Sequence, residues 1–326
     1  MKHVISVLKY LLSLALALLL LYLAFRNIDF EEFVAKSKEV DYTWVIVSII
    51  LSLVAYYARA YRWNILLKPL GYPKLNMHRT NLAILVGYLA NLAFPRLGEV
   101  TRCGMMKRSD GVNLSQSLGT VISERLIDLL TLISLIIISL FVEYDRLMRF
   151  LTDVYSGLGD VEGLMWKAAL ILGLGGVLFL ALMYVLYKKN DRVREFIKDL
   201  IRGLLSLKDI ENLPGFIIST VILWVTYYFM SYIIVFSVPE TSHLTWDAGL
   251  MLLVTGGIAL AIPVQGGIGT YHAMVSAMLV LYGVEKTTGV FLATLLHTSQ
   301  IVAVAVFGGM ALVVSFFIRK SHDNQS

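Results

Sequence analysis

The sequence contains little of what a soluble protein needs. Only 16% of its 326 residues are charged, whereas 58% are hydrophobic and the mean hydropathy is +0.74. The single cysteine, Cys103, excludes an internal disulfide and a cysteine-rich metal site. An Asp-x-Asp metal motif, a phosphate-binding glycine loop and a nucleophile elbow are also missing. We therefore expect an all-α, polytopic membrane protein with no cofactor, no metal, no catalytic residues and no nucleic-acid partner.

Nine apolar stretches follow one another along the chain. A transmembrane helix needs about 20 apolar residues. Six stretches meet this length and are predicted to span the membrane: 4–25, 44–67, 115–142, 166–187, 214–238 and 289–318. The first has the basic start of a signal peptide but no convincing cleavage site, so we expect it to be retained.

The remaining stretches are broken. Residues 80–95 are too few to cross the bilayer comfortably and end at Pro95. Residues 246–262 and 268–283 are separated by "PVQGGIG", whose proline and glycines cannot continue a helix. The residues expected to form these breaks are Pro95, Gly98, Pro263, Gly266, Gly267 and Gly269.

The charges of the loops predict the orientation, because lysine and arginine are retained on the cytoplasmic side. Loops 26–43 and 143–165 contain more acidic than basic residues. Residues 59–79 contain five basic residues and no acidic one, and residues 188–208 contain seven basic residues. The basic residues of 59–79 are Arg59, Arg62, Lys68, Lys74 and Arg79. We expect a protein of the inner (cytoplasmic) membrane with both basic loops and both termini in the cytoplasm.

This orientation requires both broken segments to return to the side from which they enter. Residues 80–110 and 246–283 are then two opposed re-entrant helical hairpins. The single membrane domain, 1–326, divides into inverted repeats 1–142 and 166–318, with a cytoplasmic linker at 188–213. Such repeats recur in transporters. The alternative is eight or nine ordinary helices, two of them kinked.

The stretch "FPRLGEVTR" places charges directly after the first break. Irregular backbone at membrane depth is tolerated where it is buried in protein or lines a polar cavity. Arg96 and Arg102, together with the amino ends of two half-helices, would suit a phosphate or carboxylate, with Glu99 as an orienting or gating partner. Alternatively, both arginines extend to cytoplasmic lipid phosphates.

The following helix, residues 117–134, carries polar residues on one face. Glu124 and Asp128 are like charges one turn apart, which is unfavourable without a cation between them or protonation of one. Arg125, Arg96 and Arg102 are the cations considered. This face either contacts a substrate or clamps the hairpin to the helix.

Near the end of the chain, His297 and Gln300 are expected at a depth similar to that of Glu124 and Asp128. With His272, which follows the glycine-rich break, they would form the outer half of a polar path. Neutral histidines bonded within a core are the alternative.

The ordered motifs "RLGEVTR", "SERLIDLL" and "PVQGGIGT" resemble the lysylphosphatidylglycerol synthase transmembrane family, also called flippase-like or UPF0104. The matching residues are Arg96, Gly98, Glu99, Arg102, Glu124, Arg125, Asp128, Pro263, Gly266, Gly267 and Gly269. Gln265 and His272 depart from the pattern, since proline and glutamate are common there. Some members carry a carboxy-terminal aminoacyltransferase domain, which we do not expect in a sequence ending at Ser326.

The resemblance implies a lipid function, and two classes compete. The first is a flippase that moves an anionic or amino-modified phospholipid, or a polyprenyl-linked lipid, between leaflets. The second is a membrane-embedded glycosyl- or aminoacyl-transferase, or an accessory subunit of a separate lipid-modifying enzyme. A scaffold that recruits lipid enzymes is a third reading. The lack of catalytic motifs favours the flippase. The expected partners are the bilayer and a lipid substrate.

Overall fold

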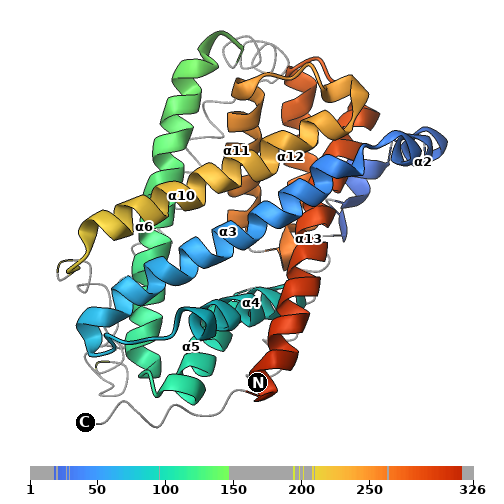
Figure 1. Ribbon diagram of the computed structural model, residues 1–326. Coiled ribbons are helices and arrows are strands. Elements are labelled where there is room, and N and C mark those ends of the chain that lie inside the picture. The colour runs from blue at the N-terminus through green and yellow to red at the C-terminus, as the bar shows by residue number, and fades with distance from the viewer. Residues whose placement is uncertain are drawn as a thin grey trace.

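The computed structural model describes residues 18–146 and 210–317, with gaps at 20, 27, 29, 95 and 263, and also residues 194, 198, 201 and 208. All assigned secondary structure in these residues is helical, so the expected all-α class is confirmed for this part of the chain (Figure 1).

Four helices in the described part are long and apolar enough to cross a membrane. They are α3 (Tyr42–Leu67), α6 (Leu114–Val142), α10 (Leu213–Tyr232) and α13 (Lys286–Phe317). The 3-10 turns η1 (Lys68–Leu70) and η2 (Ile233–Ser237) extend α3 and α10. These helices coincide with four of the six predicted spans and are candidate membrane spans. Nearly all of 4–25, all of 166–187 and most of the linker 188–213 lie outside the described residues.

The long helices are apolar on their outer faces and also on the faces that pack inside the bundle. On α6, the exposed side chains include Leu129, Ile133 and Ile137. A protein in water buries most such residues, whereas a bilayer accommodates them. The helices therefore have the surface of a multi-pass membrane protein.

Shorter helices form two pairs. Helix α4 (Met77–Ala93) turns into α5 (Leu97–Asp110), and α11 (Trp246–Ala261) leads through η4 (Gln265–Gly267) into α12 (Thr270–Leu281). The members of each pair pack against each other, and the two pairs lie toward opposite ends of the molecule (Figure 1). Each pair is thus a helical hairpin whose ends lie together.

Close backbone contact joins the first hairpin. Gly98 lies against Gly87, and a Cβ atom on Gly98 would overlap the Gly87 carbonyl oxygen. The Gly98 amide donates to Asn91 Oδ1 at 2.7 Å, which caps the amino end of α5. The predicted break at 95–98 is therefore a tight turn between two helices. Pro95 itself lies outside the described residues.

Glycines form the turn of the second hairpin. Gly266, Gly267 and Gly269 have φ angles of 58°, 73° and 83°, in the left-handed region that glycine adopts without steric cost. Turn η4 packs against α4, so the tips of the two hairpins meet inside the molecule. Pro263 lies outside the described residues.

Polar side chains define where helices begin. Their oxygen atoms accept hydrogen bonds from the free amides of the first turn, as expected of N-cap residues. Asp41, Asn76, Asn113 and Asn212 cap α3, α4, α6 and α10 in this way.

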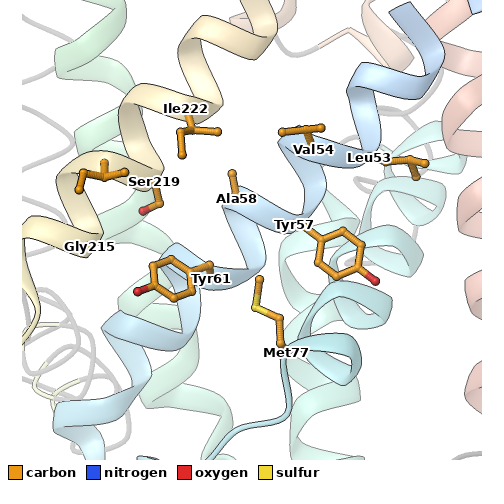
Figure 2. A pocket seen from close by; sticks show the side chains of 10 residues that line it. Leu53, Val54, Tyr57, Ala58, Tyr61, Met77, Gly215, Ser219 and Ile222 are labelled. Atoms are coloured by element: carbon orange, nitrogen blue, oxygen red, sulfur yellow. The ribbon is translucent and has the colours of Figure 1, made fainter. Parts of the chain in front are cut away.

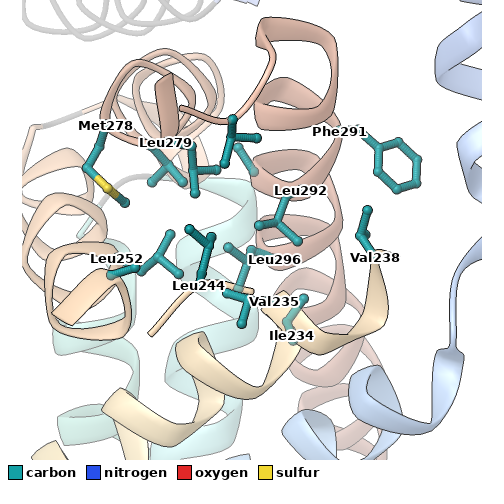
Figure 3. Close-up of a cluster of buried hydrophobic side chains, with 14 of the residues drawn as sticks. Ile234, Val235, Val238, Leu244, Leu252, Met278, Leu279, Phe291, Leu292 and Leu296 are labelled. Carbon is teal, nitrogen blue, oxygen red and sulfur yellow. The ribbon is translucent and has the colours of Figure 1, made fainter. Parts of the chain in front are cut away.

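Two apolar cores support the two hairpins. The first joins α10–η2, α11, α12 and α13, and Figure 3 shows side chains such as Leu252, Leu279 and Leu296 converging. The second joins α3, α4, α5 and α6, where Trp63, Met106 and Cys103 are fully buried. Each hairpin is therefore fixed against long helices.

Ion pairs connect the loops at each end. Helix α2 (Phe30–Glu39) meets η3 (Pro239–Thr241) through Lys36 and Glu240, at 2.5 Å. At the opposite end of α3, Lys68 pairs with Glu211, also at 2.5 Å. The segments that the charge pattern assigns to one side of the membrane are therefore neighbours.

Candidate functional site

Helix α3 carries two buried arginines within its final three turns. Arg59 and Arg62 are three residues apart and therefore share a face, with 3% and 0% of their surface exposed. A buried charge in a membrane helix is costly unless it is paired. Both arginines point toward α6, which supplies the partners.

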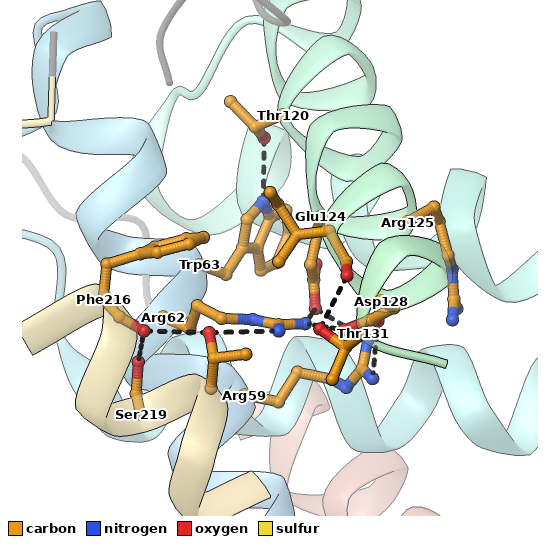
Figure 4. A network of polar contacts seen from close by, with 12 residues as sticks. Arg59, Arg62, Trp63, Thr120, Glu124, Arg125, Asp128, Thr131, Phe216 and Ser219 are labelled. Carbon is orange, nitrogen blue, oxygen red and sulfur yellow. Dashed lines mark hydrogen bonds and ion pairs between the residues drawn. The ribbon is translucent and has the colours of Figure 1, made fainter. Parts of the chain in front are cut away.

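On α6, Glu124 and Asp128 each pair with both arginines (Figure 4). Glu124 Oε1 accepts from Arg59 Nη1 at 2.7 Å and from Arg62 Nη2 at 3.1 Å. Asp128 Oδ1 accepts from Arg62 Nη2 at 2.7 Å, and Oδ2 accepts from Arg59 Nη2 at 3.1 Å. The two carboxylates are thus bridged by cations, which is one of the two arrangements predicted from their spacing.

The first hairpin supplies a third arginine. Arg102 of α5 donates to Glu124 Oε2 at 2.8 Å, so both oxygens of this fully buried carboxylate are paired. The Arg102 guanidinium also lies 4.6 Å from the Trp63 ring centroid, in cation–π contact. Trp63 is fixed by a 2.9 Å hydrogen bond from Nε1 to Thr120 Oγ1. The site therefore depends on α3, α5 and α6 together.

We call Arg59, Arg62, Arg102, Glu124 and Asp128 the arginine cluster. Three cations face two carboxylates, giving a formal charge of +1. Helix α10 adds only neutral groups, the Tyr227 hydroxyl and the Thr220 hydroxyl. The buried Nε atoms of all three arginines have no hydrogen-bond partner among the described residues. The cluster therefore has one surplus positive charge and three N–H donors that no described residue uses.

The other predicted residues of this region lie at the edge of the cluster. Arg125 pairs with Glu99 at 2.8 Å, with 45% and 21% of these side chains exposed. Arg96 is exposed and has a left-handed φ of 62°, which is unusual for a residue other than glycine. Arg96 and Arg102, predicted as one anion-binding pair, are therefore separated: Arg102 is in the cluster and Arg96 is at the surface.

Arg59 and Arg62 were assigned to a cytoplasmic loop from the sequence, and this assignment was wrong. Helix α3 continues to Leu67, so both side chains lie inside the helix bundle. The cations considered for Glu124 and Asp128 were consequently incomplete. The available signal was that positions 59 and 62 fall within the apolar stretch 44–67, spaced to share one helical face.

In the second half, the structure brings two of the three predicted polar residues together. The rings of His272 and His297 lie 5.2 Å apart, and His297 stacks on Tyr271 at 4.8 Å. Gln300 instead donates to Ser48 Oγ of α3 at 3.1 Å. The histidines form a neighbouring pair, which Gln300 does not join.

Metal binding has no support in the described part of the chain, where no three His, Cys, Asp or Glu residues gather as ligands. Among the described residues, the arginine cluster joins more charged side chains than the smaller groups at Arg146 and Lys36, and its edge lies at Glu99 and Arg125. Its chemistry is that of binding and orienting an anion, because guanidinium groups remain charged and match planar oxyanions.

Comparison with known proteins identifies the chain at the level of the family. No curated protein and no solved structure matches it. The profile described as "Lysylphosphatidylglycerol synthase TM region" matches residues 10–308. That range contains the complete arginine cluster, both hairpins and the histidine pair. The chain therefore belongs to the family of the lysylphosphatidylglycerol synthase transmembrane region, which indicates a function related to membrane lipids.

Proposed function

We propose that the protein moves a lipid with an anionic headgroup between the two leaflets of the membrane. The observation that carries this proposal is the arginine cluster, in which three buried arginines face two carboxylates. A bound phosphate would compensate the surplus charge. Charged headgroups cross a hydrocarbon core only with such fixed compensation along the path.

The arginines are suited to phosphate for geometric reasons. A guanidinium offers parallel N–H donors that bind two oxygens of one phosphate. Glu124 and Asp128 hold the guanidinium groups in place when the headgroup is absent, and a phosphate would take over part of their contacts. Helix α5 adds the partial positive charge of its amino end, which begins at Leu97.

The edge of the arginine cluster provides the entry for the lipid headgroup. The Asp128 side chain is 13% exposed, whereas the Arg62 and Glu124 side chains are fully buried. The pair Arg125–Glu99 lies beside it between α5 and α6, and exposed Arg96 precedes α5. We assign these edge residues to capture of the headgroup, with Glu99 releasing Arg125 when a phosphate arrives.

The two hairpins support a transport mechanism because their tips meet inside the molecule. The element order also repeats: long helix, hairpin, long helix occurs as α3 to α6 and again as α10 to α13. We propose that these halves are inverted repeats and that the hairpins are re-entrant. Basic loops and both termini would face the cytoplasm in the inner membrane.

Cysteine labelling tests this orientation. With Cys103 replaced, cysteine at Lys36 should react with an impermeant maleimide in intact cells, because α2 lies on the proposed outer side. Cysteine at Asp153 should also react, whereas cysteine at Lys198 should not. Labelling of Lys198→Cys from outside would contradict the inverted-repeat proposal.

Reconstitution tests transport. The purified protein in liposomes should increase the fraction of fluorescent phosphatidylglycerol that an impermeant quencher reaches. Arg102→Lys should slow this exchange because it keeps the charge but removes the planar fork. The matched control is Arg79→Lys, which alters an ion pair with Asp110 outside the cluster. Equal rates for both variants would contradict phosphate binding by Arg102.

The same vesicles distinguish transport from lipid synthesis. Supplied with aminoacyl-tRNA or a nucleotide sugar, they should produce no new lipid by mass spectrometry. A new aminoacyl- or glycosyl-lipid that depends on the protein would support the transferase alternative. A headgroup label applied to intact cells, with and without the protein, identifies which lipid changes leaflet.

A further inference from the structure

Helix α2 contains no buried residue, although it is fixed to the helix bundle. Figure 1 shows it at the edge of the molecule, and it packs beside α13. The Phe33 ring meets the Phe291 ring of α13 edge to face, with centroids 5.1 Å apart. Lys36 pairs with Glu240 on the same side. These contacts hold one face of α2 against the protein and leave its other faces exposed.

The exposed surface of α2 consists of two different faces. Phe30 and Val34 are four residues apart and therefore share one face, with 62% and 54% of their surface exposed. Glu31, Ala35 and Glu39 follow the same spacing and form a second exposed face. Helix α2 thus has one face toward the protein, one exposed apolar face and one exposed acidic face.

The neighbours of α2 indicate its level relative to the membrane. Helix α3 begins at Tyr42 and the segment α10–η2 ends at Ser237, and both segments are long and apolar enough to cross a bilayer. The Asp41 amide, which follows α2, donates to the Ser237 carbonyl oxygen at 2.9 Å. Tyr42 is 52% exposed, and tyrosine is enriched at the membrane–water boundary. Helix α2 therefore lies where two candidate spans leave the membrane.

The apolar face also continues beyond α2. The Phe30 ring stacks on the Phe25 ring with centroids 6.3 Å apart. Tyr22, earlier in the same stretch, is 64% exposed. Both residues belong to the apolar stretch 4–25, which is predicted to span the membrane. The lipid-facing surface thus extends onto Phe30 and Val34, and this continuity identifies lipid as the occupant of the apolar face.

We propose that α2 is an interfacial helix, which lies along the membrane surface with Phe30 and Val34 inserted between headgroups and acyl chains. An amphipathic helix of this kind buries its apolar face about 5–10 Å into that boundary and keeps its polar face in water. Glu31 and Glu39 occupy the water side. The contact anchors the bundle at the membrane surface, and it requires neither lipid transport nor a particular orientation of the chain.

Two other positions provide references for lipid and for water. A groove of about 580 Å³ lies between α3 and α10, and its lining is mainly apolar (Figure 2). Val54 in this groove is 47% exposed and lies in the interior of the candidate span Tyr42–Leu70, so it is the reference for acyl chains. Lys74, exposed in the loop before α4, is the reference for water.

Spin labels on single cysteines measure the insertion. The full chain, with Cys103 replaced, carries one nitroxide at a time in phosphatidylcholine liposomes. Oxygen concentrates in hydrocarbon and a nickel chelate stays in water, so their collision rates with the label report its depth. Labels at Phe30 and Val34 should lie about 5–10 Å deep, between the labels at Val54 and Lys74.

The acidic face is the control for this measurement. Labels at Glu31 and Glu39 should be as accessible to the nickel chelate as the label at Lys74. Equal nickel accessibility at all four α2 positions would place the helix in water and overturn the proposal. Shielding of the labels at Phe30 and Val34 from both reagents would show that protein covers this face, which would overturn it as well.

Two neighbouring substitutions give an independent test, because water and lipid predict opposite orders of stability. On a helix surrounded by water, Ala35→Asp would be the more harmful, since a carboxylate at position 35 lies one turn from Glu31 and from Glu39. A carboxylate at position 34 lies one turn from Lys38, which is favourable in water. At the membrane surface, Val34→Asp places a charge against hydrocarbon and should lower the thermal midpoint more than Ala35→Asp does.

The midpoints are measured by circular dichroism of the full chain in small phosphatidylcholine vesicles. Equal midpoints for the two variants, or a lower midpoint for Ala35→Asp, would contradict insertion of the apolar face. Neither measurement follows lipid exchange, so failure of the proposed transport would leave both results unaffected.

Discussion

Replacing Glu124 with glutamine should be among the most destabilising single substitutions in the bundle. Its two oxygens accept charged hydrogen bonds from Arg59, Arg62 and Arg102, at 2.7, 3.1 and 2.8 Å. A glutamine amide keeps one oxygen and presents an NH₂ donor where the other stood. At least one guanidinium therefore loses its acceptor and faces another donor.

The expected loss of stability follows from the burial of the Glu124 carboxylate and its arginine partners. The variant leaves three arginines with Asp128 alone, so the formal charge of the cluster changes from +1 to +2. Removing one member of a buried ion pair typically costs about 3–5 kcal/mol, because the remaining charge stays buried without compensation. Exposed pairs contribute only about 0.2–1 kcal/mol. Glu99→Gln, which alters the half-exposed pair with Arg125, is the matched control.

The assay is denaturant unfolding in mixed micelles followed by far-UV circular dichroism. Glu124→Gln should reduce the free energy of unfolding by about 3–5 kcal/mol, and Glu99→Gln by no more than about 1 kcal/mol. Adding Arg102→Met to Glu124→Gln returns the formal charge to +1. The double variant should therefore be more stable than the sum of the single effects predicts, by about 1 kcal/mol or more. Equal effects of Glu124→Gln and Glu99→Gln would refute the assignment of a buried, interdependent cluster.

Two further predictions use the hairpin and the loop contacts. Gly98→Ala should destabilise the protein by about 1–3 kcal/mol, because the new methyl group overlaps the Gly87 carbonyl. Gly104→Ala, in open space on the same helix, should be neutral or stabilising by up to about 1 kcal/mol, as unfolding in micelles would show. The hydrogen bond from Lys36 holds the pKa of Glu240 below its usual value. A carboxylate with a lowered pKa stabilises the fold above its unfolded pKa and loses this effect as pH falls through the folded pKa. Glu240→Gln should therefore lower the thermal midpoint at pH 7 but not at a pH below the folded pKa, and a constant difference would contradict this linkage.

The helical pattern of the described residues could be predicted because it depends on local sequence. The lengths of the apolar stretches identified α3, α6, α10 and α13. Proline and glycine identified the positions of the two breaks, because proline cannot continue a helix and glycine adopts the left-handed backbone angles of the second turn without steric cost. The spacing of Glu124 and Asp128 also indicated either a cation between them or protonation of one of them.

The identity of those cations could not be obtained by counting charges along the chain. Arg59 and Arg62 precede a basic loop and were grouped with it, although helical spacing places them on a buried face. Their partners on α6 are more than 60 residues away, and only tertiary packing brings them within hydrogen-bond distance. Separation of Gln300 from the histidines has the same cause, because its partner, Ser48, lies on α3.

Transport as a function of headgroup charge tests the central claim most directly. The measurement compares fluorescent phosphatidylglycerol with a glucosyl-diacylglycerol of the same chains, in liposomes with and without the protein. Because the arginine cluster carries surplus positive charge, the protein should accelerate exchange of the phosphatidylglycerol at least tenfold more than exchange of the uncharged lipid. Equal acceleration of both lipids, or acceleration of neither, would contradict the proposal that the cluster carries an anionic headgroup across the membrane.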